Sequence, residues 1–184
     1  IYSRDFRQTS MAESRSLFEQ ALRTRRSIDD RRGIAESLFH VGLTWENKKD
    51  PSAEELRRAR ASHEEALAIG EAGGFDIEAS YAVRHLAGHK LDAGDLDAAL
   101  AGFERSLELR LRAGYHIYLA PALMAVGDVW KARGNTSKAR EYFERALAEA
   151  NRLGATGLQD TAREALQSVP AAGPRRRRSR GRPC

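Results

Sequence analysis

The sequence predicts an all-α fold, a right-handed superhelical solenoid built from helical hairpins. The first observation is a repeat with a fixed period of 40 residues, since Gly94 and Phe103 are followed by Gly134 and Phe143. A period of this size is typical of proteins in which each unit buries its apolar side against the next. The second observation is that apolar residues recur every three or four positions within the repeat, which is the pattern of a helix with one apolar face.

Eight helices are expected from this pattern. They span residues 13–26, 32–47, 53–71, 76–92, 96–113, 117–132, 136–152 and 158–168. The first is the second half of a repeat, the next six form three full repeats, and the last is a shorter capping helix. Gly94-Asp95 and Gly134-Asn135 supply the stop and turn signals between the two helices of a hairpin. About three repeats are needed before such an array is stable, so the chain has just enough.

The first full repeat is five residues longer than the others. Trp45 corresponds to Trp130, yet Ala59 follows Trp45 after 14 positions, whereas Ala139 follows Trp130 after nine. The extra residues fall around 48–52, where the sequence Lys-Lys-Asp-Pro-Ser is typical of a turn. We therefore expect the insertion to lengthen a loop and to leave the helices intact.

The ends of the chain differ from the repeats. Residues 1–12 are expected to be a poorly ordered or truncated lead-in, 13–168 the repeat array, and 169–184 a disordered arginine-rich tail. The array opens with half a repeat, which favours a fragment of a longer array. The single cysteine, Cys184, allows no disulfide within the chain and favours a reducing compartment. No secretory leader and no apolar run of about 20 residues is visible, so the expected location is the cytoplasm.

The charge of the chain is concentrated in the tail. Residues 175–184 contain six arginines and no acidic residue. The whole chain has a net charge of +5, so the rest of the chain carries a net charge of −1. In the repeats, acidic and basic residues are interspersed. The repeats are therefore not expected to form a broad nucleic-acid platform on charge alone.

Two motifs resemble the tetratricopeptide repeat family. Val126-Gly127-x-x-Trp130 followed by Ala139-x-x-x-Phe143 fits the pattern of that family. The resemblance covers roughly residues 13–168 and implies antiparallel hairpins that present a concave groove to a protein or peptide. The period and the missing closing proline are similar to a longer-linker branch of the family. The segment 30–38 resembles a sequence that is common between the repeats of bacterial signal-transduction and transcriptional regulators.

The resemblance also implies which residues line the groove, because the first helix of each hairpin faces it. The set comprises Glu36, Phe39, His40, Leu43 and Glu46; Tyr81, Arg84, His85 and Gly88; and Pro121, Met124, Asp128 and Lys131. Arginine, histidine and aromatic side chains in one groove can hold an extended or helical peptide through ion pairs and aromatic contacts. The alternative is an ordinary solvated face.

Some members of the family clamp a peptide carboxylate with Lys, Asn and Arg at set positions of the groove. The corresponding positions here are Phe39, Leu43, His85, Pro121 and Ala125. Because none of these side chains matches the clamp, binding of a chaperone tail is not expected.

Neither a metal site nor a cofactor nor catalysis is predicted. His85 and His89 lie one helical turn apart, a spacing that can hold a metal, but no third ligand is evident in the sequence. The chain has no phosphate-binding Gly-rich loop, no nucleophile elbow, and no cysteine beside a plausible base. The sequence therefore favours a binding protein over an enzyme.

The main functional hypothesis is protein–protein recognition, as a scaffold or sensor segment of a larger bacterial regulator. One alternative is a nucleic-acid-associated protein that uses the tail. The arginines involved are Arg175, Arg176, Arg177, Arg178, Arg180 and Arg182. Residues 180–183, Arg-Gly-Arg-Pro, resemble the core of the AT-hook, a reader of the minor groove. The tail is otherwise an inert segment or a nonspecific contact for polyanions. Self-association through the N-terminal face is a third hypothesis.

Overall fold

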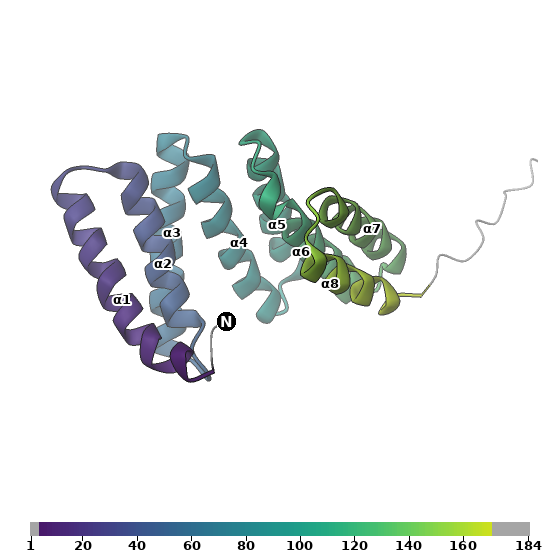
Figure 1. Ribbon diagram of the computed structural model, residues 1–184, viewed down its shortest axis with the longest axis horizontal. Coiled ribbons are helices and arrows are strands. Elements are labelled where there is room, and N and C mark those ends of the chain that lie inside the picture. Colours follow the sequence, from purple (N-terminus) through teal and green to yellow (C-terminus); the bar gives the residue numbers. More distant parts are fainter. Residues whose placement is uncertain (1–3, 171–184) are drawn as a thin grey trace, which may run out of the picture.

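The computed structural model describes residues 4–170, with side chains described from residue 11 onward. Eight α-helices and one 3-10 helix follow one another along this part of the chain. They are α1 (Arg4–Ser27), α2 (Arg31–Glu46), α3 (Ala53–Gly73), α4 (Asp76–Asp92), α5 (Leu96–Arg112), η1 (His116–Tyr118), α6 (Leu119–Ala132), α7 (Thr136–Arg152) and α8 (Thr156–Gln167). Each helix packs on the next as an antiparallel pair, and the pairs form one row from α1 to α8 (Figure 1). The all-α, repeat-like fold class predicted from the sequence is confirmed.

The helix boundaries follow the prediction closely, with one exception. Every predicted helix ends within two residues of the observed end, and seven of the eight begin within two residues of the observed start. The exception is α1, which begins at Arg4 and so runs through most of the segment 1–12 expected to be a lead-in. The predicted helix 117–132 begins at Leu119, after η1. Pro121 then lies in its first turn, where its missing N–H costs nothing.

Short polar side chains cap the helices at the predicted turns. In the five-residue insertion, Ser52 and Glu55 form a reciprocal capping box at the start of α3. The side chains of Asp95 and Asn135 accept hydrogen bonds from backbone N–H groups at the start of α5 and α7. Gly134, just before Asn135, has a φ of 73°, a left-handed conformation that glycine adopts without steric cost. The repeat therefore encodes its own turns.

The landmark positions of the repeat form the core between paired helices. Phe103 and Phe143 are 5% and 0% exposed, and Ala99 and Ala139 are fully buried. Gly127 on α6 lies against the ring of Phe143 on α7. Alanine and glycine at these positions let the helices approach closely enough for the rings to fill the space between them.

The first full repeat departs from this rule at one position. His63 stands where the later repeats have Phe103 and Phe143, and its side chain is fully buried. Gly42 lies against its ring, as Gly127 lies against Phe143. The packing position is thus retained while the side chain becomes polar.

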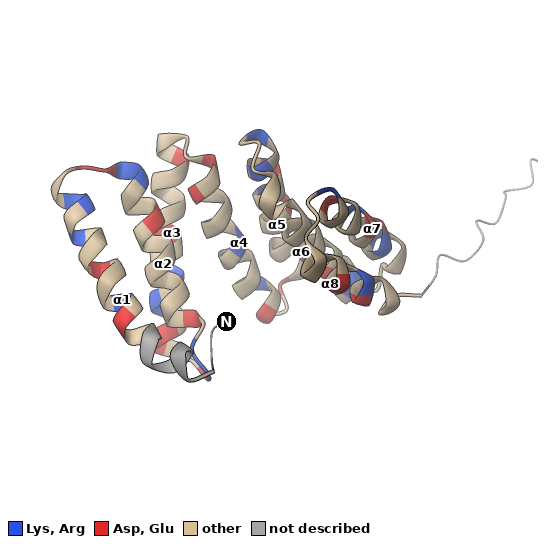
Figure 2. Ribbon diagram, in the orientation of Figure 1, with Lys and Arg blue, Asp and Glu red and all other residues tan. Residues whose placement is uncertain are grey.

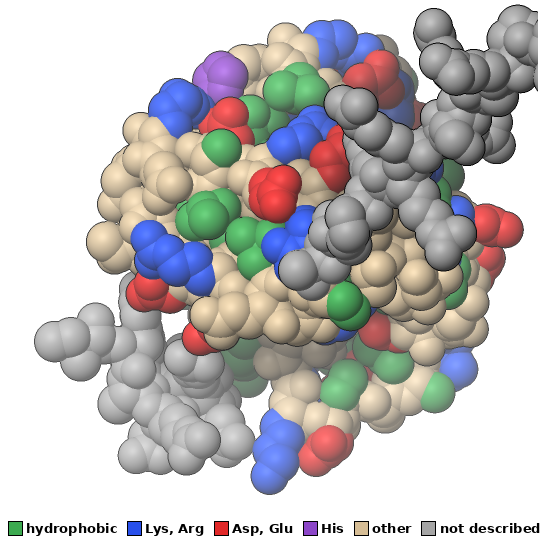
Figure 3. All heavy atoms as spheres, turned by 90° about the vertical axis from the view of Figure 1, so that its right-hand side faces the viewer, with side chains coloured by type: hydrophobic (Ala, Val, Ile, Leu, Met, Phe, Trp, Pro, Cys, Tyr) green, Lys and Arg blue, Asp and Glu red, His purple; other side chains and the backbone are tan. Residues whose placement is uncertain are grey.

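Acidic and basic side chains are spread over the helices (Figure 2). At the end of the row that holds α7 and α8, side chains of both charges are interspersed with hydrophobic ones (Figure 3). None of the helices in residues 4–170 combines the length and the apolar character needed to cross a membrane.

Candidate functional site

A cavity of about 500 Å³ lies between α2, α4 and the segment that leads from α5 into α6. Its size is within the range usual for ligand sites. Eight residues of its lining belong to the groove set predicted from the sequence: Glu36, Phe39, His40, Leu43, Tyr81, Arg84, His85 and Pro121. Five further residues line it that the sequence did not single out: Ile77, Glu78, Arg110, Tyr115 and Tyr118. We call this cavity the aromatic groove.

The remaining predicted residues lie elsewhere. Met124 packs against two of the hydrophobic clusters, one of which includes Val169. Asp128 is exposed. Lys131 donates a hydrogen bond of 2.8 Å from Nζ to Ser168 Oγ. The physical reason is that α8 packs near α6, so the C-terminal segment occupies this part of the face.

Gly88 and Glu46 also lie outside the aromatic groove. Both line a second cavity of about 440 Å³, together with His85 and His89. The predicted set therefore divides between the aromatic groove, this second cavity and the surface beside α8.

Tyrosine rings form one wall of the aromatic groove. The ring of Tyr81 stacks on Phe39 with 4.8 Å between centroids and meets Tyr118 edge-on at 5.6 Å. The hydroxyl groups of Tyr81 and Tyr115 are 3.0 Å apart and share a hydrogen bond. Burial and this hydrogen bond raise the pKa of Tyr81 above its usual range, so it remains a neutral donor and acceptor. The concentration of aromatic and apolar residues in the connection 115–118 is the signal that could have identified this wall.

Two arginines face the same groove without a carboxylate partner among the described residues. Arg110 is 1% exposed and donates to Tyr118 O at 2.9 Å and to Ser80 Oγ at 3.3 Å. Burial, with a smaller contribution from the charge of Arg84, lowers the pKa of Arg110 to about 10. Burial also lowers the pKa of Arg84, although the charge of Glu46 opposes this effect. Both groups remain cationic at neutral pH.

The acidic residues of the groove are already neutralised. Glu36 Oε2 lies 2.9 Å from Arg25 Nη2, and Glu78 Oε1 lies 2.8 Å from Arg32 Nε. The second carboxylate oxygen of Glu78 is buried and accepts no hydrogen bond from the described residues. The groove thus presents two arginines that form no salt bridge with a described carboxylate, beside aromatic surface.

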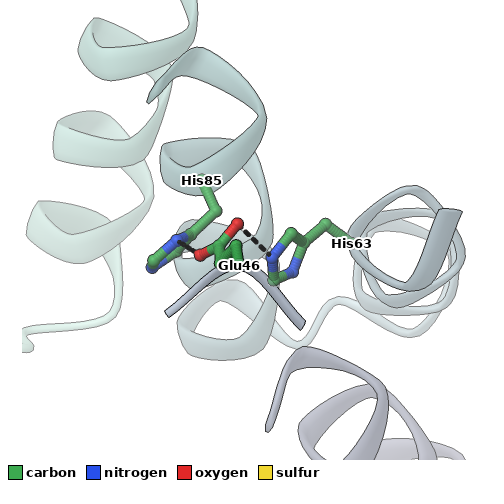
Figure 4. Close-up of side chains that lie close together, drawn as sticks. All are labelled: Glu46, His63 and His85. Atoms are coloured by element: carbon green, nitrogen blue, oxygen red, sulfur yellow. Dashed lines mark hydrogen bonds and ion pairs between the residues drawn. The ribbon is translucent and has the colours of Figure 1, made fainter. Parts of the chain in front are cut away.

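A separate cluster of polar side chains lies next to the aromatic groove. Glu46, at the end of α2, contacts both His63 and His85 through its carboxylate (Figure 4). Its Oε2 accepts from His63 Nε2 at 3.2 Å and from His89 Nε2 at 2.8 Å, and its Oε1 is in contact with His85 Nδ1. Burial alone would raise the pKa of Glu46, but the hydrogen bonds from three imidazoles hold it well below its usual range. Glu46 is therefore an ionised carboxylate in a half-buried site.

The fold brings together residues that sequence spacing could not connect. Spacing on one helix identifies only His85 and His89, whereas the fold adds Glu46 from α2 and His63 from α3. The sequence could have identified His63, because the equivalent position is phenylalanine in the other two full repeats. The arginines predicted to contact nucleic acid, within residues 175–182, lie outside the part of the chain that the structure describes.

Comparison with known proteins agrees with this geometry for the central part of the chain. No curated protein matches the sequence. Residues 77–151, which cover α4 to α7 almost completely, match the tetratricopeptide repeat family. This part of the chain is therefore a tetratricopeptide repeat region, a kind of repeat that generally mediates protein–protein interactions.

Proposed function

We propose that the aromatic groove binds a peptide segment of a partner protein and holds an acidic side chain of that segment through Arg84. The observation that carries the proposal is that one cavity combines two arginines, neither in a salt bridge with a described carboxylate, with a wall of aromatic rings. The chain acts in this proposal as a binding module and not as an enzyme.

The arginines account for the acidic preference. Removing a charge from water is costly unless the charge is paired, and Arg84 and Arg110 have no carboxylate partner among the described residues. A carboxylate supplied by a partner would form charge-assisted hydrogen bonds with the planar guanidinium group of Arg84. Arg110 already donates hydrogen bonds to Ser80 and Tyr118. We therefore propose that Arg84 contacts the carboxylate of the peptide directly and that Arg110 attracts it at longer range.

The aromatic wall and its rim favour a peptide that has an apolar side chain next to its acidic residue. Tyr81 and Phe39 offer stacked rings inside the groove. On η1, at the rim, Ile117 is 57% exposed and Tyr118 is 40% exposed. Exposed apolar side chains beside a lined cavity are typical of a docking surface, and aromatic residues and arginine are the usual sources of binding energy there.

The setting of this groove is part of the same proposal. The resemblance of the segment 30–38 to bacterial regulators supports a role as the recognition segment of a larger cytoplasmic regulator of signalling or transcription. In that setting the peptide would belong to an effector or to another domain of the regulator.

Selection from a library of short random peptides on the full chain tests the proposal. Selected peptides should be enriched in acidic residues next to aromatic or large aliphatic ones. Arg84→Glu should weaken their binding by about tenfold to a hundredfold, the range for a lost hydrogen bond to a charged group. Lys131→Glu makes the same change of charge outside the groove and should leave affinity unchanged. Equal binding by both variants, or no acidic enrichment, would contradict the proposal.

A further inference from the structure

We propose that Glu46, His63, His85 and His89 form a binding site for a divalent transition metal, with Zn²⁺ as the natural occupant. The site would join α2, α3 and α4, and it goes beyond the peptide groove because only His85 belongs to both. Imidazole nitrogens and carboxylate oxygens are ligands that Zn²⁺ takes in proteins, and four of them would fill a tetrahedral coordination shell.

The ligand atoms lie close together around the carboxylate of Glu46. Glu46, His63 and His85 each offer an atom, and these atoms all lie within 4.8 Å of one another. His89 adds Nε2, which lies 2.8 Å from the same carboxylate. The rings of His63 and His85 stand side by side with centroids 5.1 Å apart, both directed at Glu46 (Figure 4). To bind a metal ion, each ring nitrogen that now donates to the carboxylate would lose its proton, which would move to the other nitrogen of the ring or be released to solvent.

The other repeats do not have this cluster, which argues against a general packing role. The position of His63 is phenylalanine in the next two repeats, at Phe103 and Phe143. The position of His89 is valine in the last full repeat, where Val129 is fully buried. The fold thus accepts apolar side chains at these positions. Three histidines around one glutamate are a departure from the repeat of the kind expected at a functional site.

An ion can reach the cluster from solvent. The second cavity, of about 440 Å³, is lined by Glu46, His85 and His89 and also by Asp92, whose carboxylate favours a cation. The three ligands at this cavity are 11%, 19% and 13% exposed, whereas His63 closes the site from the core side with no exposure. Arg84 also lines this cavity and opposes a cation, and the charge of Glu46 offsets it.

Within the described part of the chain, two of the rings lack a hydrogen bond on the side away from Glu46. This permits metal binding and limits the affinity for the metal. The Nδ1 atoms of His63 and His89 are buried and have no hydrogen-bond partner among the described residues. No outer contact therefore fixes the tautomer of these rings, and the nitrogen that faces Glu46 can carry a proton or bind a metal. Outer-shell partners typically contribute 10–100-fold to metal affinity, so we expect a weaker site than a fully supported one.

Cobalt provides a direct test, because Co²⁺ in a tetrahedral nitrogen and oxygen site absorbs visible light strongly. The full chain with Cys184→Ser serves as the reference, so that no thiol competes for the metal. Addition of Co²⁺ should produce this absorption, and Zn²⁺ should displace it. A hundredfold excess of Zn²⁺ over its dissociation constant should raise the melting temperature by about 5–10 °C.

Two variants in this background identify the ligands. His89→Gln should weaken metal binding at least about tenfold. His63→Phe restores the side chain of the later repeats, so it is expected to fold, and it should abolish the cobalt spectrum. His40→Gln is the matched control, since His40 stacks on Phe18 at 4.7 Å, outside the cluster, and should change nothing.

Absence of both the visible absorption and the thermal shift in the reference protein would overturn the proposal and leave the cluster as a network of hydrogen bonds. Equal loss of metal binding in His40→Gln and His89→Gln would overturn the assignment of the ligands. Neither outcome affects the peptide groove, because His63 and His89 do not line it.

Discussion

Gly127 on α6 lies so close to the ring of Phe143 on α7 that a Cβ atom at Gly127 would be 2.5 Å from Phe143 Cε1. Phe143 is fully buried. The contact fixes the distance between the two helices of the last full repeat. The same relationship holds between Gly42 and His63 in the first full repeat.

Replacement of Gly127 should therefore destabilise the array. Gly127→Ala is expected to lower the free energy of unfolding by about 1–3 kcal/mol, because the added methyl group overpacks the interface. Gly88→Ala is the control, since a Cβ at Gly88 would meet no atom within 4 Å. That change should be neutral or stabilise the helix by about 0.5–1 kcal/mol. Urea unfolding measures both, and equal effects would show that close approach is not the reason for glycine at position 127.

The second prediction concerns which face of α7 is packed. Phe143→Ala should cost about 3–5 kcal/mol, because it removes a fully buried ring and leaves a cavity. Glu144, the next residue, is exposed, and among the described residues its one ion pair is with Arg140, at 3.8 Å. Glu144→Ala should therefore change stability by no more than about 0.5 kcal/mol. If thermal unfolding showed similar losses for both variants, the packing of this face would be wrong.

The third prediction is a pH dependence at the capping box. Hydrogen bonds from Lys48 and from Ser52 lower the pKa of Glu55 to about 2. Because this pKa is below that of the unfolded chain, the stabilisation by Glu55 is fully present above about pH 4.5 and is lost as the pH falls towards 2. The difference in urea midpoint between the wild type and Glu55→Gln should thus be largest at neutral pH and shrink below pH 4.5. A difference that stayed constant down to pH 3 would assign the effect of the substitution to something other than the charge.

Features of the fold and of the groove could be predicted where they depend on residues close together in the sequence. Periodicity and turn residues act within a few positions, so Gly134 and Asn135 were enough to predict the turn, and Phe143 was enough to predict the core. The family resemblance supplied the register of the first helix in each hairpin, which predicted Phe39, Tyr81 and Arg84 in one groove, and all three line the cavity.

The remainder depended on contacts that no local pattern contains. Glu46 and His89 are 43 positions apart and meet only because α2 and α4 both pack on α3. Tyr115 enters the groove from a connection whose path the repeat does not specify. Lys131 was placed in the groove because the register ignores the capping helix, which provides Ser168 as its partner. These are effects of tertiary packing, and single-helix spacing does not predict them.

The last prediction concerns the tail, which holds six arginines within residues 175–184. Since the rest of the chain has a net charge of −1, any affinity for DNA should reside in this segment. The truncation should keep Val169 and Pro170, because Val169 is 4% exposed and Arg140 donates to the carbonyl oxygens of both residues. Removal of residues 171–184 should abolish binding to a labelled random-sequence duplex and leave the melting temperature unchanged. Binding that survived the truncation would place the nucleic-acid site on the repeats.

The dependence on salt and sequence separates simple charge from groove reading. Six arginines neutralise at most about six phosphates, so the logarithm of the affinity should fall with the logarithm of salt concentration at a slope no steeper than about −5. Gly181→Val keeps the charge but adds bulk within Arg180-Gly181-Arg182. If the tail reads the minor groove as an AT-hook does, this variant should lose affinity for A·T-rich duplexes selectively, because a branched side chain blocks close approach to a narrow groove. Equal affinity for A·T-rich and G·C-rich duplexes, before and after the change, would reduce the tail to a nonspecific contact for polyanions.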